Sequence, residues 1–256
     1  MTSVDLNCDI GESFGAWTLG ADDDVLAQVS SANIACGFHA GDAATMRRTV
    51  DRALARGVAL GAHPGLPDLA GFGRRAMEIS PDEAYEMVVY QVGALAAFAA
   101  ARGARLAHVK PHGALYNMAA TRPTLADAIA RAVHDVDAGL MLFALAGSAL
   151  VIAARSVGIT PIEEVFADRR YAADGTLVPR THPGAVITDA AAAVTQAVRM
   201  VREGRVTAID GTDVRVHAGT ICIHGDTPGA AEHARALRAA LDAAGVTIAA
   251  PTGARA

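Results

Sequence analysis

Short apolar or β-branched segments alternate with longer alanine-rich segments of helical character along the whole chain. Such alternation is typical of an α/β fold, in which helices join parallel strands. The expected strands begin at Val4, Ala32, Val58, Leu106, Leu140, Thr160, Thr207 and Thr220. The expected helices cover residues 43–56, 81–101, 124–136, 148–157, 189–203 and 229–244. We therefore predict seven or eight strands, closed as a TIM-like barrel or lying in an open sheet.

The chain has the composition of a folded protein and shows no internal boundary. Its 256 residues are 52% apolar and 19% charged, which excludes the composition of intrinsic disorder. No linker rich in serine or glycine, no run of charge and no fixed-period repeat divides it. Ser80, Pro81 and Glu83 form a capping-box pattern at the start of the helix expected over 81–101. We expect residues 1–256 to form a single barrel domain.

Charge and hydropathy argue against several classes of partner. The net charge is −5 and the arginines are scattered, so we expect no nucleic acid and no anionic membrane surface to bind. The longest uncharged apolar stretch, residues 138–154, is too short to span a bilayer, and the N-terminus lacks the pattern of a signal peptide. Three cysteines without CxxC spacing suggest neither a disulfide framework nor a thiolate zinc site. A cytoplasmic location is the expectation.

A polar, turn-rich segment follows most of the expected strands. These segments are residues 7–12, 33–42, 61–75, 109–117, 164–171 and 222–226. The carboxyl ends of the strands in a parallel barrel share one rim, so the segments are expected to converge around one mouth. Four histidines follow four different strands: His39, His63, His112 and His224. One loop histidine is usually an ordinary hydrogen-bonding residue, but four in this pattern favour an active site.

The same segments carry the candidate catalytic groups. Asp9 and Glu12 lie three residues apart in one turn, where they can bind a divalent cation or act as a general base. Lys110 is the only lysine beside 21 arginines, and it is expected to point into the rim, where an ammonium can stabilise an oxyanion. His63 and His112 complete the predicted catalytic set. The side chains expected to bind substrate or phosphate are Asn7, Asn33, His39, Arg74, Asn117, Asp168, Arg169, Tyr171, Arg180, His224 and Asp226.

Several enzyme classes and one residue role are disfavoured by the sequence. The chain lacks GxxxxGK[ST], GxSxG and HExxH, which argues against a self-contained P-loop ATPase, an α/β-hydrolase and a zincin. Ser148 is better interpreted as a helix N-cap than as a nucleophile. An N-cap is also the simpler interpretation of Asp42 and Asp226.

Six sequence motifs are distributed along the whole chain. They are DLNCDIGESFG (5–15), SANIACGFHAGD (31–42), GAHPGLPDLAGFGRR (61–75), HVKPHGALYN (108–117), EVFADRRY (164–171) and CIHGDTPGA (222–230). Together they resemble the LamB/YcsF family, from the first expected strand to the last expected helix. The resemblance implies a seven-stranded β/α barrel related to glycoside hydrolases and polysaccharide deacetylases.

The resemblance also implies an activity, because members of this family are known as the A subunit of prokaryotic ATP-dependent 5-oxoprolinase. That enzyme cleaves 5-oxo-L-proline to L-glutamate, coupled to hydrolysis of ATP to ADP and phosphate, and ATP would bring Mg²⁺. The implied partners are two further subunits, B and C, and a homo-oligomer stays open. As hypothesis, Lys110 with Arg74 or Arg169 neutralises a phosphate or an oxyanion. Asp9 or Glu12 would act as base or hold magnesium, and a histidine would protonate the departing nitrogen.

Two functions of other classes remain open at this point. A metal-dependent deacetylase or amidohydrolase would hold a transition metal, and Asp9, His39 and His63 are the residues that would echo the Asp/His/His site of the deacetylase relatives. A non-catalytic subunit would hold substrate while its partners perform the chemistry. A polar rim serves all three functions, so the sequence does not separate them. It also leaves open which chain of the complex binds ATP.

Overall fold

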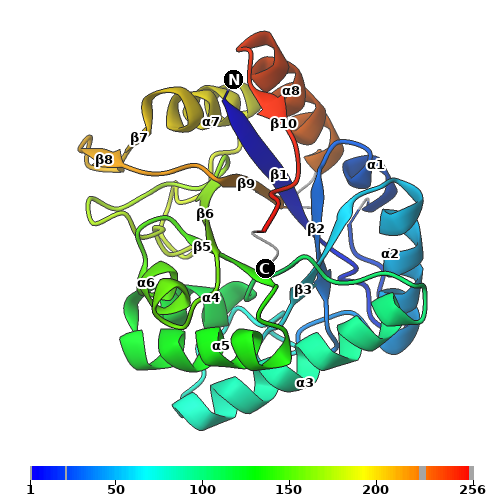
Figure 1. Cartoon of the computed structure of the whole chain (residues 1–256). Helices are drawn as coiled ribbons and strands as arrows, with labels where there is room; N and C mark the ends of the chain where they lie inside the picture. Colours follow the sequence, from blue (N-terminus) through cyan, green and yellow to red (C-terminus); the bar gives the residue numbers. More distant parts are fainter. Residues whose placement is uncertain (1, 21, 225–228, 254–256) are drawn as a thin grey trace.

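The computed structural model describes residues 2–20, 22–224 and 229–253. Seven of the described strands form a closed parallel barrel (Figure 1). They are β1 (Ser3–Ile10), β2 (Ser31–Ala35), β3 (Ala59–His63), β4 (His108–Val109), β5 (Met141–Leu145), β6 (Pro161–Phe166) and β9 (Thr220–His224). Strand β9 pairs in parallel with both β6 and β1, which closes the ring. The predicted barrel is confirmed, and the open-sheet alternative is wrong.

Helices surround the outer face of the barrel (Figure 1). They are α1 (Asp22–Leu26), α2 (Ala43–Ala55), α3 (Pro81–Ala100), α4 (Gly113–Thr121), α5 (Pro123–Val136), α6 (Ala149–Ser156), α7 (Ala190–Glu203) and α8 (Ala230–Ala243). The capping box at the start of α3 is present, because Ser80 Oγ accepts from Glu83 N and Glu83 Oε2 accepts from Ser80 N. All six predicted helices are confirmed. The sequence does not predict the short helices α1 and α4.

The strand expected at Thr207 exists but does not belong to the barrel. It is β7 (Arg205–Thr207), which pairs antiparallel with β8 (Asp213–Arg215) in a separate two-stranded sheet. The chain turns back directly after β7, where Ala208 N donates to Thr212 O over 2.8 Å. The turn pairs β7 with β8, and β7 has no partner among the barrel strands. A tenth strand, β10 (Thr247–Ile248), pairs with the beginning of β1.

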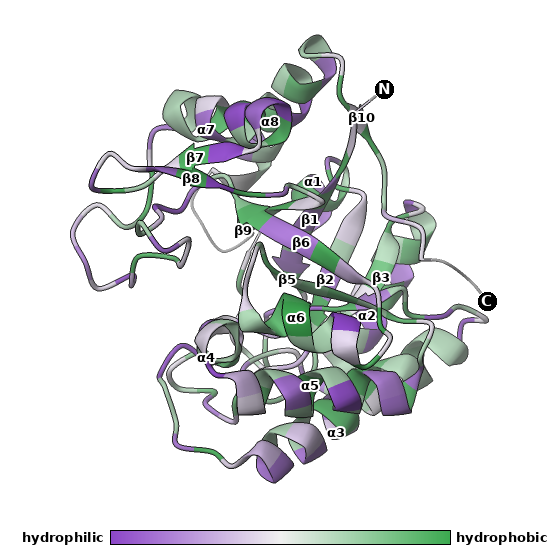
Figure 2. Cartoon of the chain, turned by 60° about the vertical axis from the view of Figure 1, so that its left-hand side comes forward, coloured by the Kyte–Doolittle hydropathy of each residue, from purple (hydrophilic) through white to green (hydrophobic). Residues whose placement is uncertain are grey.

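The alternation of side chains along β1 divides the molecule into an apolar shell and a polar barrel interior. Val4, Leu6, Cys8 and Ile10 are buried in the hydrophobic core cluster. Asp5, Asn7 and Asp9 alternate with them and are also buried, and their partners come from other barrel strands. Figure 2 shows the same division as a hydrophilic segment in β6 within a largely apolar wall. Since TIM-type interiors are usually filled by branched apolar residues, this polar interior calls for a functional explanation.

None of the helices within the described ranges is long and apolar enough to cross a membrane.

Candidate active site

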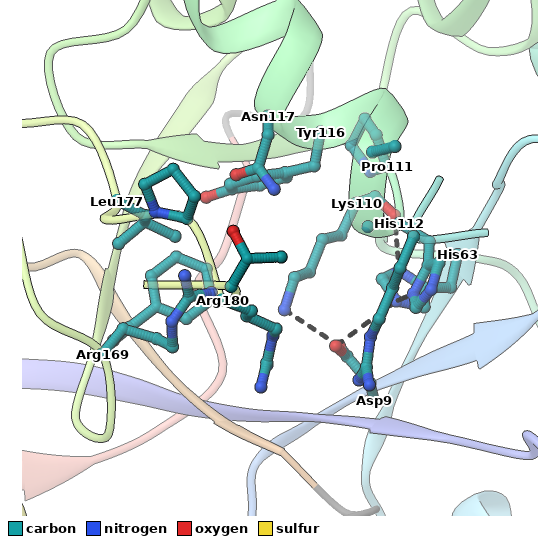
Figure 3. Close-up of a pocket in the computed structure, with 16 residues that line it drawn as sticks. Asp9, His63, Lys110, Pro111, His112, Tyr116, Asn117, Arg169, Leu177 and Arg180 are labelled. Carbon is teal, nitrogen blue, oxygen red and sulfur yellow. Dashed lines mark hydrogen bonds and ion pairs between the residues drawn. The ribbon is translucent and has the colours of Figure 1, made fainter. Parts of the chain in front are cut away.

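A cavity of about 390 Å³ opens at the carboxyl ends of the barrel strands (Figure 3). Its lining includes eight of the residues singled out from the sequence: Asp9, His63, Arg74, Lys110, His112, Asn117, Arg169 and Arg180. Asp9 and His63 lie at the ends of strands β1 and β3, and Lys110 directly follows β4. The predicted convergence around one mouth is therefore confirmed for the segments 7–12, 61–75, 109–117 and 164–171, each of which contributes to the lining. The apolar side chains of Phe166 and Leu177 complete the opposite wall.

The floor of the cavity is a buried ion pair between Lys110 and Asp9. Lys110 Nζ donates to Asp9 Oδ1 over 2.9 Å, and the same carboxylate oxygen accepts from Asn33 Nδ2 over 2.8 Å. Asp9 Oδ2 lies 3.4 Å from His63 Nε2. The carboxylate is thus held in one orientation by a cation and an amide, with its second oxygen directed toward a histidine.

A second carboxylate, Glu164 of β6, completes the surroundings of Lys110. Glu164 Oε1 lies 2.9 Å from Lys110 Nζ, which also donates to Asn7 Oδ1 over 3.2 Å. Burial by itself lowers the pKa of this lysine, but Asp9, the Cys222 sulfur and Glu164 together raise it well above its usual value. Lys110 is therefore a fixed cation that holds the floor together, with its N–H groups directed to protein acceptors.

Asn7 and Asn33 lie below the cavity, inside the barrel. Asn7 Nδ2 donates to Glu164 Oε1 over 2.9 Å and to Thr220 Oγ1 over 2.7 Å, and Asn33 Nδ2 donates to Asn7 Oδ1 over 2.6 Å. His108 Nε2 donates to Asn33 Oδ1 over 2.7 Å. The sequence predicts that these amides bind substrate, but their side chains are fully engaged in positioning the floor. These hydrogen bonds connect Asp9 and Lys110 to residues deeper inside the barrel.

Asp5 forms the lowest layer of this network. Its carboxylate accepts from Ser30 and Ser31 through Oδ1 and from Thr220 through Oδ2, over 2.6 to 2.8 Å. Burial raises the pKa of Asp5 to about 6, and these hydroxyl donors only partly offset that effect.

Three arginines face the mouth of the cavity. Arg169 and Arg180 lie on the side opposite His63 and His112 (Figure 3), in the segment between β6 and α7. Arg169 is buried, donates to Val178 O over 2.6 Å, and has its pKa lowered to about 10 by burial and by Arg180. Arg74 is exposed, and its guanidinium lies 4.8 Å from the centre of the Phe72 ring. This wall can attract a small anion.

His63 and His112 meet edge to edge at the other side of the cavity. His63 Nδ1 lies 2.6 Å from Lys110 O, and His112 Nε2 lies 2.8 Å from Phe72 O. Because carbonyl oxygens only accept, each of these nitrogens carries the proton. The remaining nitrogens, His63 Nε2 and His112 Nδ1, are 2.9 Å apart. Burial, His39 and His63 hold the pKa of His112 well below its usual range.

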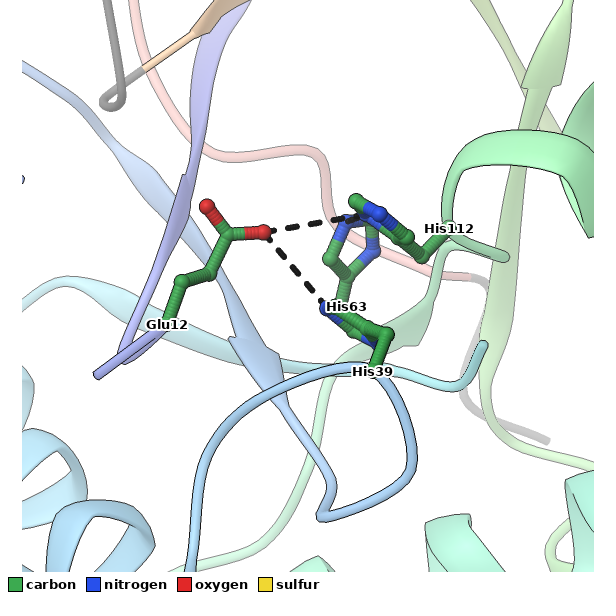
Figure 4. A group of neighbouring side chains, drawn as sticks. All are labelled: Glu12, His39, His63 and His112. Atoms are coloured by element: carbon green, nitrogen blue, oxygen red, sulfur yellow. Dashed lines mark hydrogen bonds and ion pairs between the residues drawn. The ribbon is translucent and has the colours of Figure 1, made fainter. Parts of the chain in front are cut away.

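Glu12 and His39 lie behind this pair and are buried (Figure 4). Glu12 Oε1 is 3.5 Å from His39 Nε2 and 3.7 Å from His112 Nδ1. The rings of His39 and His112 are stacked, with centroids 3.7 Å apart. Burial and the neighbouring His63 lower the pKa of His39 well below its usual value. Three of the four histidines predicted after separate strands, His39, His63 and His112, thus form one cluster, which Glu12 joins.

The remaining predicted residues occupy different places. Asn117 is exposed on α4 at the cavity rim. Tyr171 is buried, and its hydroxyl accepts from Phe166 N over 2.8 Å, so it supports the β6 end from within. Asp168 lines a smaller, separate pocket beside Cys222. His224 ends β9, and Asp226 lies outside the described residues.

Sequence reasoning misses several residues of this site, among them Glu164 and Phe72. Glu164 had a signal, because alternation along β6 places it on the same face as Phe166 and so toward the interior. Phe72 had none, since its role depends on a backbone φ of +56° that directs its carbonyl to His112. A positive φ in a bulky residue is a strained conformation and is found chiefly at functional sites.

The chain is similar to known proteins over almost its whole length. The model of the LamB/YcsF family matches residues 4–256. A protein of Bordetella pertussis, named as the A subunit of 5-oxoprolinase, is 62% identical over 246 residues, which are 96% of this chain and 98% of that protein. The crystal structure of a lactam utilization protein from Thermus thermophilus superposes with a TM-score of 0.92 at 51% identity, covering 98% of this chain and 100% of the other. A family 4 carbohydrate esterase from Streptomyces lividans shares the fold alone, with a TM-score of 0.50 at 11% identity over 96% of this chain and 91% of that one.

Proposed function

Since the chain belongs to the LamB/YcsF family, we propose that it is the A subunit of an ATP-dependent 5-oxoprolinase. In this role it opens the ring of 5-oxo-L-proline to give L-glutamate, with ATP hydrolysed to ADP and phosphate. The observation that carries the proposal is the mouth cavity, in which a fixed carboxylate faces a wall of arginines. That arrangement suits a small substrate with one negative charge and one amide to be hydrolysed.

The arginine wall supports recognition of the substrate carboxylate. Arg180 and Arg169 lie across the cavity from Asp9 (Figure 3), so a carboxylate bound there directs the lactam ring toward the floor. Guanidinium groups bind carboxylates and phosphates through paired hydrogen bonds. The cavity is also large enough for a five-membered ring with a phosphoryl group beside it.

The need for ATP follows from the chemistry of the lactam. Its amide carbon is a poor electrophile, and transfer of the γ-phosphoryl group from ATP to the carbonyl oxygen, which releases ADP, makes that carbon open to attack by water. Attack by water and cleavage of the ring C–N bond would leave an acyl phosphate, from which a second water molecule releases phosphate and glutamate. Arg74 and the other cations at the mouth would stabilise the phosphoryl group in this step. Mg²⁺ would arrive with ATP, and subunits B and C are the proposed partners of the complex.

The floor supplies the groups for proton transfer. Asp9, held through Oδ1 by Lys110 and Asn33, would accept a proton from the attacking water. Asp9 would then return this proton to the departing ring nitrogen from Oδ2, the oxygen that lies 3.4 Å from His63 Nε2. Lys110 is a positioning residue in this scheme, because its ammonium is already surrounded by protein acceptors.

The test is formation of glutamate and ADP from 5-oxo-L-proline and ATP, first with this chain alone and then with subunits B and C added. The proposal expects equal amounts of both products, and only in the complete mixture. Glutamate formed without ATP would instead favour a metal-dependent amidohydrolase. Normal ATP-coupled turnover by B and C without this chain would overturn the proposal.

A further inference from the structure

A buried cluster of one carboxylate and three imidazoles lies beside the mouth cavity (Figure 4). Its members are Glu12, His39, His63 and His112, and one ligand atom from each lies within 4.8 Å of the others. It is the one such cluster of histidine, cysteine, aspartate and glutamate among the residues that the structure describes. The proposed lactam chemistry gives no reason for these four groups to meet there.

The contact between His63 and His112 requires a positive species. His63 carries its proton on Nδ1 and His112 on Nε2, because each of these nitrogens faces a backbone carbonyl. In the neutral rings, His63 Nε2 and His112 Nδ1 then direct two lone pairs at each other over 2.9 Å. Such a contact is repulsive unless a proton or a metal cation lies between the nitrogens.

The surroundings of the two rings match those of metal-binding histidines. A ligand histidine almost always donates its other ring N–H to a carbonyl or a carboxylate, which fixes the tautomer. Lys110 O and Phe72 O are such acceptors, and the positive φ of Phe72 places its carbonyl there. A strained backbone that directs a carbonyl to one imidazole indicates that the orientation of His112 matters.

His39 and Glu12 supply the rest of a ligand set. Within the described chain neither ring nitrogen of His39 makes a hydrogen bond, although the ring is buried. No bond therefore opposes a rotation of this ring away from its stacked position on His112. Space for the rings depends on Gly65 and Gly73, where an added Cβ would lie 2.5 Å from His39 Nδ1 and 2.9 Å from His112 Cδ2.

We propose that Glu12, His39, His63 and His112 bind one divalent transition-metal cation of the zinc class. Bonds of about 2.0 Å in a tetrahedral site place ligand atoms about 3.3 Å apart. The contacts of 2.9 Å between His63 and His112, and of 3.5 and 3.7 Å from Glu12 to His39 and His112, need only small adjustments to reach that spacing. Imidazole with one carboxylate is a donor set that suits zinc and its neighbours. Asp9 is not a member of the group of four whose ligand atoms lie within 4.8 Å of one another.

Metal binding to the isolated chain tests this proposal without reference to lactam or ATP. Protein stripped with a chelator is titrated with Zn²⁺ by calorimetry and with Co²⁺ by visible absorption, and metal content is measured after dialysis. We expect about one equivalent of Zn²⁺ per chain and tetrahedral Co²⁺ bands. Affinity should fall by at least about a hundredfold in His112→Gln and His39→Gln, because loss of an outer-shell partner alone costs about 10- to 100-fold. His217→Gln changes an exposed histidine outside the cluster and should bind as the wild type does.

Two results would overturn the proposal. One is a wild-type chain that takes up no Zn²⁺ or Co²⁺; the other is an unchanged affinity in both His39→Gln and His112→Gln. Either result assigns a proton to the gap between His63 and His112. If His112→Gln does not fold, as judged by circular dichroism, His39→Gln decides, because His39 makes no hydrogen bond in the described chain.

Discussion

Lys110 is the residue on which the floor of the site depends. Its ammonium lies between the buried carboxylates of Asp9 and Glu164, each 2.9 Å away. Removal of one partner from a buried ion pair leaves a charge without compensation, which costs about 3–5 kcal/mol. We therefore predict that Lys110→Met lowers the free energy of unfolding in urea by that amount. Arg155→Met, which removes an exposed pair with Glu163, should cost less than about 1 kcal/mol. An equal decrease in the free energy of unfolding of the two variants would contradict the role of Lys110 as the buried cation that holds the floor together.

Gly61 is required by the close approach of His108 inside the barrel. A Cβ at this position would lie 2.0 Å from His108 Nε2, the atom that donates to Asn33. Gly61→Ala should therefore lower the free energy of unfolding by about 1–3 kcal/mol, because the imidazole has to move. Gly93→Ala is the matched control, since no atom lies within 4 Å of its added Cβ in helix α3. That variant should be neutral or more stable than the wild type.

Asp5 gives the barrel interior a pH dependence. Its pKa is about 6 in the folded chain, above the 3.8 of an ordinary aspartate, so the native state binds this proton more tightly than the unfolded state. The resulting stabilisation is complete below about pH 4 and is lost as the pH rises through about 6. We predict that the free energy of unfolding of the wild type falls by up to about 3 kcal/mol relative to that of Asp5→Asn between pH 4 and pH 7. Urea unfolding at each pH measures this difference. A constant difference between the two proteins over this range would contradict the prediction.

At the scale of elements, the segment between β6 and α7 forms the cationic wall of the cavity. It carries Arg169 and Arg180, both of which line the mouth. Loss of a hydrogen bond between charged groups costs about 1.5–3 kcal/mol, which corresponds to a roughly 10- to 100-fold change in affinity. Arg180→Ala should weaken binding of 5-oxo-L-proline by that factor in calorimetry. Arg170→Ala is the control, because Arg170 lies in the same segment but lines a different pocket. Similar losses in both variants would exclude a specific role for Arg180.

The elements show how far the sequence predicts the fold. The bounds of long helices such as α3 are predictable to within one residue, since caps and periodicity act locally. Helix α4 is missed because its residues, which begin in HGALYN, are assigned to the rim as a loop. Strand β7 is predictable as a strand, but its sheet depends on the turn after Ala208, a tertiary property. The sequence predicts which segments after the strands meet at the candidate site. The pairing of His63 with His112 is not predictable, because it depends on distances that only the folded chain defines.

At the scale of the whole molecule, the barrel places two chemical centres side by side. One is the carboxylate floor with its arginine wall, and the other is the cluster of Glu12 and three histidines. His63 contacts both, since its Nε2 lies 3.4 Å from Asp9 Oδ2 and 2.9 Å from His112 Nδ1. The closed ring of strands holds the two centres at fixed positions, as a parallel barrel does for residues at its strand ends.

The most direct test of the proposed mechanism is the turnover number of Asp9→Asn in the complex reconstituted with subunits B and C, measured as glutamate released from 5-oxo-L-proline in the presence of ATP. Asp9 is the proposed base, and loss of a general base lowers the rate by about 10²- to 10⁴-fold. Asp135→Asn, on the exposed face of α5, is the control and should turn over normally. The mechanism predicts a loss in that range for Asp9→Asn with a folded chain. Near-normal turnover in Asp9→Asn would contradict it.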